Sequence, residues 1–435
     1  MALGGGKFVL QNKILPGSYI NIVSAAAASA AASDRGVAAV GIPLDWGSAD
    51  GIIELTSADI QKNSLKILGC AYTDDKIKYL REMFANAVKV YAYRLNGANA
   101  KAASNNLAAA KYPGTRGNDI TIIVAANVDD ETKFDVSTVL GSDTVDTQTV
   151  KTASELVGND FVEFKKDAEI TVAAGMPLTG GANGEVTAAE HQTFLDKIEK
   201  YSFNALCCAS TDDKIKGLYV NYTKRLRDEV GKKFQTVVYN YPADYEGIVN
   251  VKNKPSDSEN EADLTYWVTG VVAGTAVNKS ALNLKYNGEF KPCVDYSQSQ
   301  LEQAIQNGEF TLHQVGDDIR VLNDINSLVT VSDNKGDIFK DNQTIRVIDQ
   351  IANDIAVLFN TRYLGVVPND KSGRVSLWND IVTHHRQLEQ IRAIEDFSGD
   401  DVVVEQGNSK KSVVVTDAVT VVNAMEKLYM TVTVS

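Results

Sequence analysis

Histidines, cysteines and paired aspartates are the residues of this sequence whose types could perform chemistry. His384 and His385 are adjacent in a predicted helix, so their rings point about 100° apart and do not readily share a metal ion. We therefore expect them to be solvated or to face a partner. His191 and His313 have no cysteine or carboxylate pattern around them. With so few histidines and no pattern of an activated nucleophile, an enzyme is the weaker hypothesis.

The cysteines give no sign of a disulfide framework or an all-cysteine zinc site. There are four, too few and too unevenly spaced for either: Cys70, Cys207, Cys208 and Cys293. We expect them to be reduced thiols in a core.

Phosphate-binding and catalytic sequence motifs are also missing. Gly114–Asn118 could cradle an anion, but the lysine and helix of a phosphate-binding loop do not follow it, and a plain turn is the alternative. The sequence contains no Walker A motif, dinucleotide fingerprint, nucleophile elbow or His-Glu-x-x-His zinc motif. It therefore favours a protein that is not an enzyme and has no cofactor or metal.

One eleven-residue segment occurs twice, as Cys70–Leu80 and as Cys208–Leu218, with nine of eleven positions identical. Each copy contains Thr-Asp-Asp, which supplies the oxygen and the negative charge that a helix start favours; metal ligation by the aspartates is the alternative. Leu65 onwards is predicted to be a strand that enters a helix over Lys76–Ala87. The second copy is predicted to begin a helix over Lys214–Lys232. We expect two similar strand-helix-strand units in one sheet.

Composition sets limits on partners and compartment. The chain has 435 residues, of which 44% are hydrophobic, and a formal net charge of −13. This acidic balance argues against direct binding of nucleic acid and of anionic membranes. No signal peptide or membrane-spanning run is visible, so we expect no membrane insertion and synthesis in a cytoplasm.

Hydrophobic periodicity predicts an α/β core (α+β overall) with an inserted β-rich domain, a C-terminal α+β domain and extended N- and C-terminal arms. The C-terminal domain contains predicted helices over Ile345–Arg362 and Ser376–Ile391, followed by short valine-rich strands. The predicted ranges are 1–23 for the N-terminal arm, 24–97 with 185–340 for the core, 98–184 for the insertion, 341–424 for the C-terminal domain and 425–435 for the C-terminal arm.

The C-terminal arm has the period of a half-buried strand. Alternate residues from Leu428 to Val434 are apolar, and the strand runs to the end of the sequence: Leu428, Met430, Val432 and Val434. Such a strand either pairs within its own domain or is donated to another chain. The N-terminal arm also carries a strand pattern, with Leu15, Tyr19, Ile20 and Ile22. We interpret both arms as contacts between subunits.

Several short motifs follow one another in order along the whole chain. They are Leu15–Ile20, Tyr112–Asn118, Leu178–Gly181, Lys224–Asp228, Lys232–Gln235, Tyr363–Gly365 and Met425–Met430. No single motif is specific, but their order resembles that of contractile tail sheath proteins. The resemblance is to the short type found in myophages, phage-like particles and R-type bacteriocins of Gram-positive bacteria.

The resemblance implies a structural function. Subunits of such a sheath would polymerise helically around a tail tube and contract, driving the tube through a bacterial cell envelope without nucleotide hydrolysis. The implied partners are other copies of this chain, the tail tube protein, and baseplate and tail-terminator proteins. The insertion would lie outermost, the C-terminal domain nearest the tube, and each arm would add a strand to a neighbour's sheet. Assembly would occur in the bacterial cytoplasm, with release in a virion or extracellular particle after lysis.

Cations around the helix Ser376–Ile391 are the candidates for contact with the tube: Lys371, Arg374, Arg386 and Arg392. Their alternative interpretation is ordinary solvated charge. For the chain as a whole, the rival hypothesis is a soluble α/β enzyme or ligand-binding protein with a β-rich insertion. A tail tube protein is a second rival, but the repeated α/β units argue against it.

Overall fold

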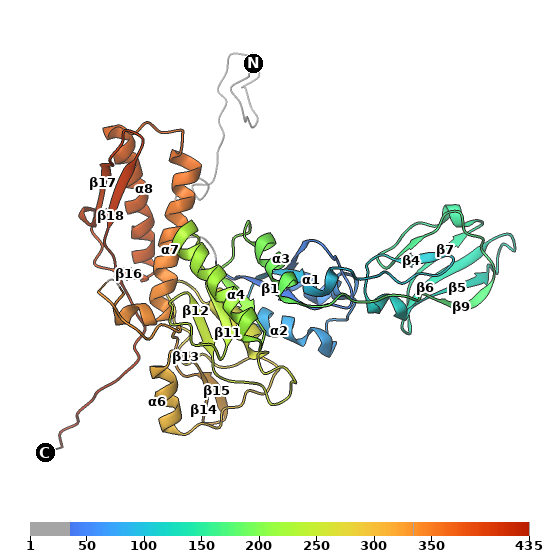
Figure 1. Cartoon of the computed structure of the whole chain (residues 1–435), viewed down its shortest axis with the longest axis horizontal. Helices are drawn as coiled ribbons and strands as arrows, with labels where there is room; N and C mark the ends of the chain where they lie inside the picture. Colours follow the sequence, from blue (N-terminus) through green and yellow to red (C-terminus); the bar gives the residue numbers. More distant parts are fainter. Residues whose placement is uncertain (1–34, 334, 435) are drawn as a thin grey trace, which may run out of the picture. The chain divides into compact units, whose positions relative to one another are not determined.

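The computed structural model describes residues 35–333 and 335–434. The chain divides into two compact units (Figure 1). The larger unit contains Arg35–Ile345 together with the last residues from Glu426, and the C-terminal unit contains Arg346–Met425. The predicted N-terminal arm lies outside the described residues.

A mostly parallel sheet forms the centre of the larger unit. Within residues 35–333 it has seven strands in the order β13-β12-β11-β10-β1-β3-β2, all paired parallel except β2 with β3. Strands β10, β11 and β12 are buried at every position, as expected of a parallel sheet covered on both faces. The bounds are β1 Val37–Ile42, β2 Ile52–Thr56, β3 Lys89–Arg94, β10 Ala205–Cys208, β11 Gln235–Tyr239, β12 Ile248–Val251 and β13 Glu309–Phe310.

Helices cover both faces of this sheet, because successive side chains of each strand point to opposite faces. Ala38, Val40 and Ile42 of β1 pack with α1, α2 and α5, whereas Ala39 packs with α3 and α4. The helices are α1 (Ser57–Leu68), α2 (Lys78–Phe84), α3 (Ala188–Ile198), α4 (Asp213–Lys224) and α5 (Leu264–Gly274). A further helix, α6 (Gln298–Gln306), precedes β13, and the hairpin β14 (Leu312–Val315) and β15 (Asp318–Val321) follows it.

The repeated segment caps a helix in both copies. The Asp74 side chain accepts from the Lys76 backbone N–H at 2.9 Å, and the Asp212 side chain accepts from the Lys214 N–H at 2.8 Å. The predicted capping role and the common sheet are confirmed. The predicted strand from Leu65 is wrong, because those residues end α1, which a capping box at Thr56 starts.

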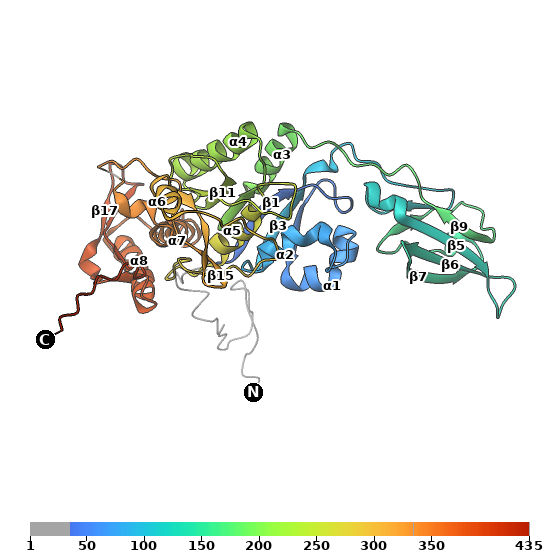
Figure 2. The same cartoon turned by 90° about the horizontal axis from the view of Figure 1, so that it is seen from below.

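The insertion consists of antiparallel strands that lie between β3 and β10 in the sequence. Figure 2 shows β5, β6, β7 and β9 as one layer, in the order β7-β6-β5-β9, and β4 pairs separately with β8. The two chain segments that connect the insertion to the core lie side by side: Lys101 bridges Ala182, and Ser104 bridges Thr179. The bounds are β4 Ala108–Ala110, β5 Ile120–Ala126, β6 Phe134–Leu140, β7 Asp143–Val150, β8 Val162–Phe164 and β9 Ala173–Pro177.

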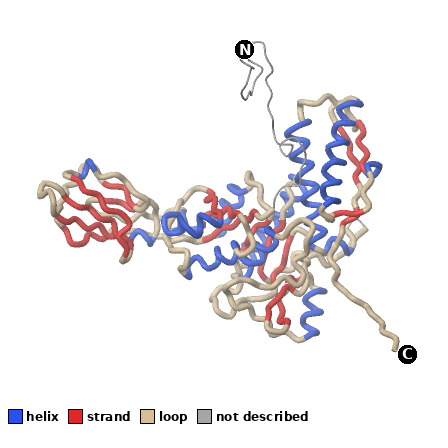
Figure 3. Tube along the Cα trace, turned by 180° about the vertical axis from the view of Figure 1, so that it is seen from behind, coloured by secondary structure: helices blue, strands red, loops and turns tan. Residues whose placement is uncertain are grey.

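The C-terminal unit combines long helices with small antiparallel sheets (Figure 3). It takes in α7 (Asn342–Leu358) from Arg346 onward, a π-helical turn that continues α7, and α8 (Lys371–Gln390). Both predicted helices are confirmed; α8 starts earlier than predicted because Asp370 caps it. Its strands are β16 Ile394–Glu395, β17 Val402–Gln406, β18 Val413–Asp417 and β19 Thr420–Val421, paired as β16-β19 and β17-β18.

Helix α5 packs unusually close to α2 through its glycines. A Cβ added to Gly270 would lie 2.3 Å from the Met83 carbonyl oxygen, and one added to Gly274 would lie 2.0 Å from the Asn86 carbonyl oxygen. The small-residue run that the sequence shows here therefore sets the distance between the two helices.

We predict that Gly270→Ala lowers the free energy of unfolding by about 1–3 kcal/mol, because the helices must separate to relieve the overlap. Gly217→Ala in α4 is the matched control, since its Cβ would lie 3.4 Å from Tyr241 Oη, an ordinary contact. The control should gain up to about 1 kcal/mol from helix propensity. Denaturant titration of both variants tests this, and equal effects would contradict the close-packing interpretation.

Candidate functional site: an exposed C-terminal segment and an open hairpin

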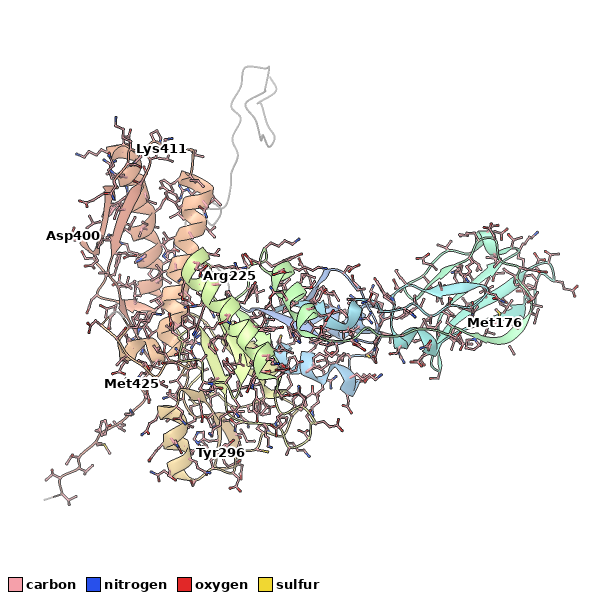
Figure 4. The ribbon with its side chains drawn as sticks, in the orientation of Figure 1. Met176, Arg225, Tyr296, Asp400, Lys411 and Met425 are labelled. Atoms are coloured by element: carbon pink, nitrogen blue, oxygen red, sulfur yellow. The ribbon has the colours of Figure 1, made fainter. Side chains whose placement is uncertain are left out.

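The C-terminal segment presents apolar side chains to solvent. After Met425 the described backbone is extended and forms neither helix nor strand (Figure 4). The side chains of Leu428, Met430, Val432 and Val434 are between 70% and 90% exposed. At the base of the segment, Asn323 Nδ2 donates to Glu426 Oε1 at 3.3 Å. The alternating pattern found in the sequence is thus not buried by the described part of the chain.

The hairpin β17–β18 of the C-terminal unit has one covered face and one open face. Val402 and Val404 pack with the cluster formed by α7 and α8, whereas Val403 and Val414 are exposed. The Trp378 indole N–H fixes the hairpin to α8 by donating to the Val402 carbonyl at 3.0 Å. In the described residues this sheet contains no third strand, so its outer edges can accept an added strand.

The predicted tube-facing cations are placed unequally. Lys371 and Arg386 lie exposed on α8, and Arg392 lies exposed just beyond its end, with a left-handed φ of 61°. Arg374 is half-buried, and its Nη1 donates to Asn369 O at 3.2 Å and Asn369 Oδ1 at 3.0 Å. Three of the four are therefore available to a partner, while Arg374 holds the loop before α8.

The expectation that His384 and His385 are solvated or face a partner is wrong. Both side chains are fully buried in the C-terminal unit. His384 Nε2 lies 3.0 Å from Asp354 Oδ2, and His385 Nε2 lies 2.9 Å from Asp417 Oδ2. The carboxylates come from α7 and β18, and their distance in sequence hides this pairing.

The glycine-rich turn Gly114–Asn118 joins the insertion to the core. A Cβ on Gly114 would lie 2.1 Å from the Asp45 carbonyl oxygen. Buried Arg94 donates to the carbonyls of Pro113 and Gly47, and desolvation lowers its pKa to about 10. Core residues thus pack closely against Gly114, and the residues after it form a 3-10 helical turn, Thr115–Asp119.

No three histidine, cysteine or carboxylate side chains in residues 35–333 and 335–434 are grouped to hold a metal ion. Of the helices in the same ranges, none has both the length and the apolar character needed to cross a bilayer.

Three domain models of one family match consecutive parts of the chain. The phage tail sheath protein beta-sandwich domain matches residues 96–183, the phage tail sheath protein central domain matches 184–327, and the phage tail sheath C-terminal domain matches 334–435. Together they cover the insertion, much of the core and the C-terminal unit.

Individual proteins match over nearly the full length. The XkdK protein of the phage-like element PBSX of Bacillus subtilis (strain 168) is 30% identical over 470 residues, covering 100% of each chain. The crystal structure of a sheath tail protein from Desulfitobacterium hafniense has 34% identity and a TM-score of 0.82, covering 95% of this chain and 99% of that one. A Listeria innocua sheath tail protein has 32% identity and a TM-score of 0.79, with 93% and 96% covered.

The agreement extends from sequence to fold, and the architecture described above is that of the sheath tail proteins. The chain therefore belongs to the phage tail sheath protein family and is a structural subunit of a contractile tail sheath.

Proposed function

We propose that this subunit polymerises helically around a tail tube and that contraction of the polymer drives the tube through a bacterial cell envelope. The observation that carries the proposal is the exposed segment Leu428–Val434 with its alternating apolar side chains, found in the same chain as a hairpin with open edges. A donor on one subunit and an acceptor on the next make a head-to-tail contact, which generates open helical polymers. The rival hypothesis of an enzyme or ligand-binding protein has no support among the matched families.

Strand addition by the C-terminal segment must use both its side chains and its backbone. Burying one apolar side chain of this size yields about 1.5–3 kcal/mol, and fixing the backbone of one residue costs about 1–2 kcal/mol. Only every second residue of the segment faces inward in an added strand. The free energy gained by burying side chains and the entropic cost of ordering the backbone therefore nearly cancel. The hydrogen bonds of a sheet edge supply the remaining binding free energy and set the register.

The hairpin β17–β18 of a neighbouring subunit is the acceptor that we propose. Its exposed valines, Val403 and Val414, lie on the open face of the sheet. The N-terminal arm, with Leu15, Tyr19, Ile20 and Ile22, lies outside the described residues, and its role as a second donor stays a prediction.

We propose roles in the polymer for the other domains as well. The insertion 98–184 is the outer domain, and the C-terminal domain 341–424 faces the tube through Lys371, Arg386 and Arg392, which are exposed. Baseplate and tail-terminator proteins would contact the two ends of the polymer. Assembly in the bacterial cytoplasm and release after lysis complete the proposal.

The alternating pattern provides a sharp test of strand donation. We predict that Met430→Asp combined with Val432→Asp abolishes polymers, because the charges would enter the neighbour's core. The matched control, Thr431→Asp with Thr433→Asp, changes the opposite face and should retain them. Since Met430 and Val432 are exposed in the single chain, the stability of the monomer should be equal in both variants.

Negative-stain microscopy measures the outcome, alongside a truncation that lacks Met425–Ser435 and should give isolated particles. Hydrogen exchange locates the acceptor: Val402–Asp417 should gain protection when the intact chain polymerises. Polymers of the truncated protein, or equal effects of the two double variants, would overturn strand donation.

Contact with the tube is tested by charge reversal. Arg386→Glu with Arg392→Glu should weaken co-assembly with the tail tube protein and leave empty sheath polymers intact, because rim charge pairs mainly steer association. Lys101→Glu with Lys151→Glu, exposed in the insertion, is the control and should co-assemble normally. Co-sedimentation with tubes gives the measurement; unchanged binding by the first variant would refute the assignment.

A further inference from the structure

Four titratable side chains form a continuous chain of contacts within the C-terminal unit, and the two histidines at its centre are buried. Asp354 of α7 contacts His384 of α8, the two histidine rings contact each other, and His385 contacts Asp417 at the end of β18. The distances are 3.0 Å for Asp354 Oδ2 to His384 Nε2, 3.3 Å between the two Nδ1 atoms and 2.9 Å for His385 Nε2 to Asp417 Oδ2. The contacts thus link α7 through α8 to β18.

The two rings are shielded from solvent. Both histidine side chains are fully buried, and the Phe397 ring lies 5.1 Å from the His385 ring. On α7, the Gln350 amide donates to Asp354 Oδ2 at 2.9 Å. The side chains of Asp354 and Asp417 are 7% and 24% exposed, respectively.

Several of the other charged groups on the packed elements make contacts of their own. On α8, Asp380 accepts from the Tyr363 hydroxyl and pairs with Arg362, Glu389 accepts from the Phe397 backbone N–H, and Arg386 is exposed. Asp401, before β17, accepts from the Ser398 N–H. The remaining charged groups on these elements are Arg346 and Asp349 of α7, Lys371 and Arg374 of α8, Glu405 of β17 and Glu395 of β16, with Asp396 and Asp400 beside them. Asp354 and Asp417 are therefore the carboxylates that contact the histidine rings.

The three contacts fix the number of protons that the four side chains must share. Each of the three contacts is a hydrogen bond only if it contains one proton, which either of its two partners can carry, so the three contacts together need three protons. Two neutral histidines facing two carboxylates carry only two protons, so two nitrogen lone pairs would oppose each other between the rings. Two doubly protonated histidines carry four, so two N–H groups would oppose each other. The three contacts are all satisfied only when the pair carries one proton beyond its neutral state.

We propose that the His384–His385 pair holds a single shared extra proton and that this proton locks α7, α8 and β18 together. Loss of the proton, or gain of a second one, breaks the central hydrogen bond and loosens the unit. Because Asp417 ends β18, the lock reaches the hairpin β17–β18 directly. The C-terminal unit is thus a pH-sensitive element, whatever its partners in a sheath.

Histidine-specific NMR of the full chain tests the proton count. The sequence contains four histidines, so ¹⁵N-histidine spectra with single-residue variants assign every ring. We expect the pair to show one imidazolium and one neutral ring, or one averaged set, while the unit is closed. Between about pH 5 and 8, where histidine titrates, hydrogen-exchange protection of α8 should be greatest while one extra proton is held.

Asp417→Asn provides a variant that keeps the contact and removes the charge, since the amide oxygen still accepts from His385 Nε2–H. Its pair should bind the extra proton about tenfold more weakly, because a carboxylate beside an imidazolium stabilises the charged form. Asp400→Asn, an exposed acid of the same unit (Figure 4), is the control and should change nothing. Two neutral rings in the closed protein, or identical titration of wild type and Asp417→Asn, would overturn the proposal.

Discussion

Every strand must satisfy its backbone N–H and C=O groups by pairing or by contact with water, and this requirement organises the subunit. The central sheet meets it for its five inner strands by pairing on both sides, and β13 at one margin has only two residues. The hairpin β17–β18 and the segment after Met425 are different, since their pairing within the described chain is incomplete. The subunit therefore joins a central sheet that is largely paired within itself to C-terminal segments whose backbone pairing is incomplete.

Electrostatics limits how such subunits can join. Each chain carries a formal charge of −13, so copies repel one another over about one Debye length, roughly 8 Å at physiological salt. Backbone hydrogen bonds and apolar contacts act at shorter range and are little affected by salt. Attachment through strands therefore provides cohesion where uniform surface charge would oppose it.

The sequence predicts those elements whose causes are local. The helix starts at Asp74 and Asp212, the long helices α7 and α8 and the valine-rich strands all follow from caps and periodicity. Leu65–Leu68 was predicted as a strand because a short apolar run fits either structure, and the deciding residue, Thr56, lies a full helix upstream. The burial of His384 and His385 was missed because their carboxylate partners lie 30 and 32 residues away in the sequence.

The insertion is a module, because the two chain segments that connect it to the core pair with each other. Lys101 bridges Ala182, Ser104 bridges Thr179, and the Gly184 N–H donates to the Asn96 carbonyl at 2.9 Å, so the chain leaves and re-enters the core at adjacent points. A segment whose two ends are neighbours can be exchanged for another of different length without moving the strands that flank it. The insertion can therefore vary in length and sequence, or be replaced by design, while the central sheet keeps its geometry.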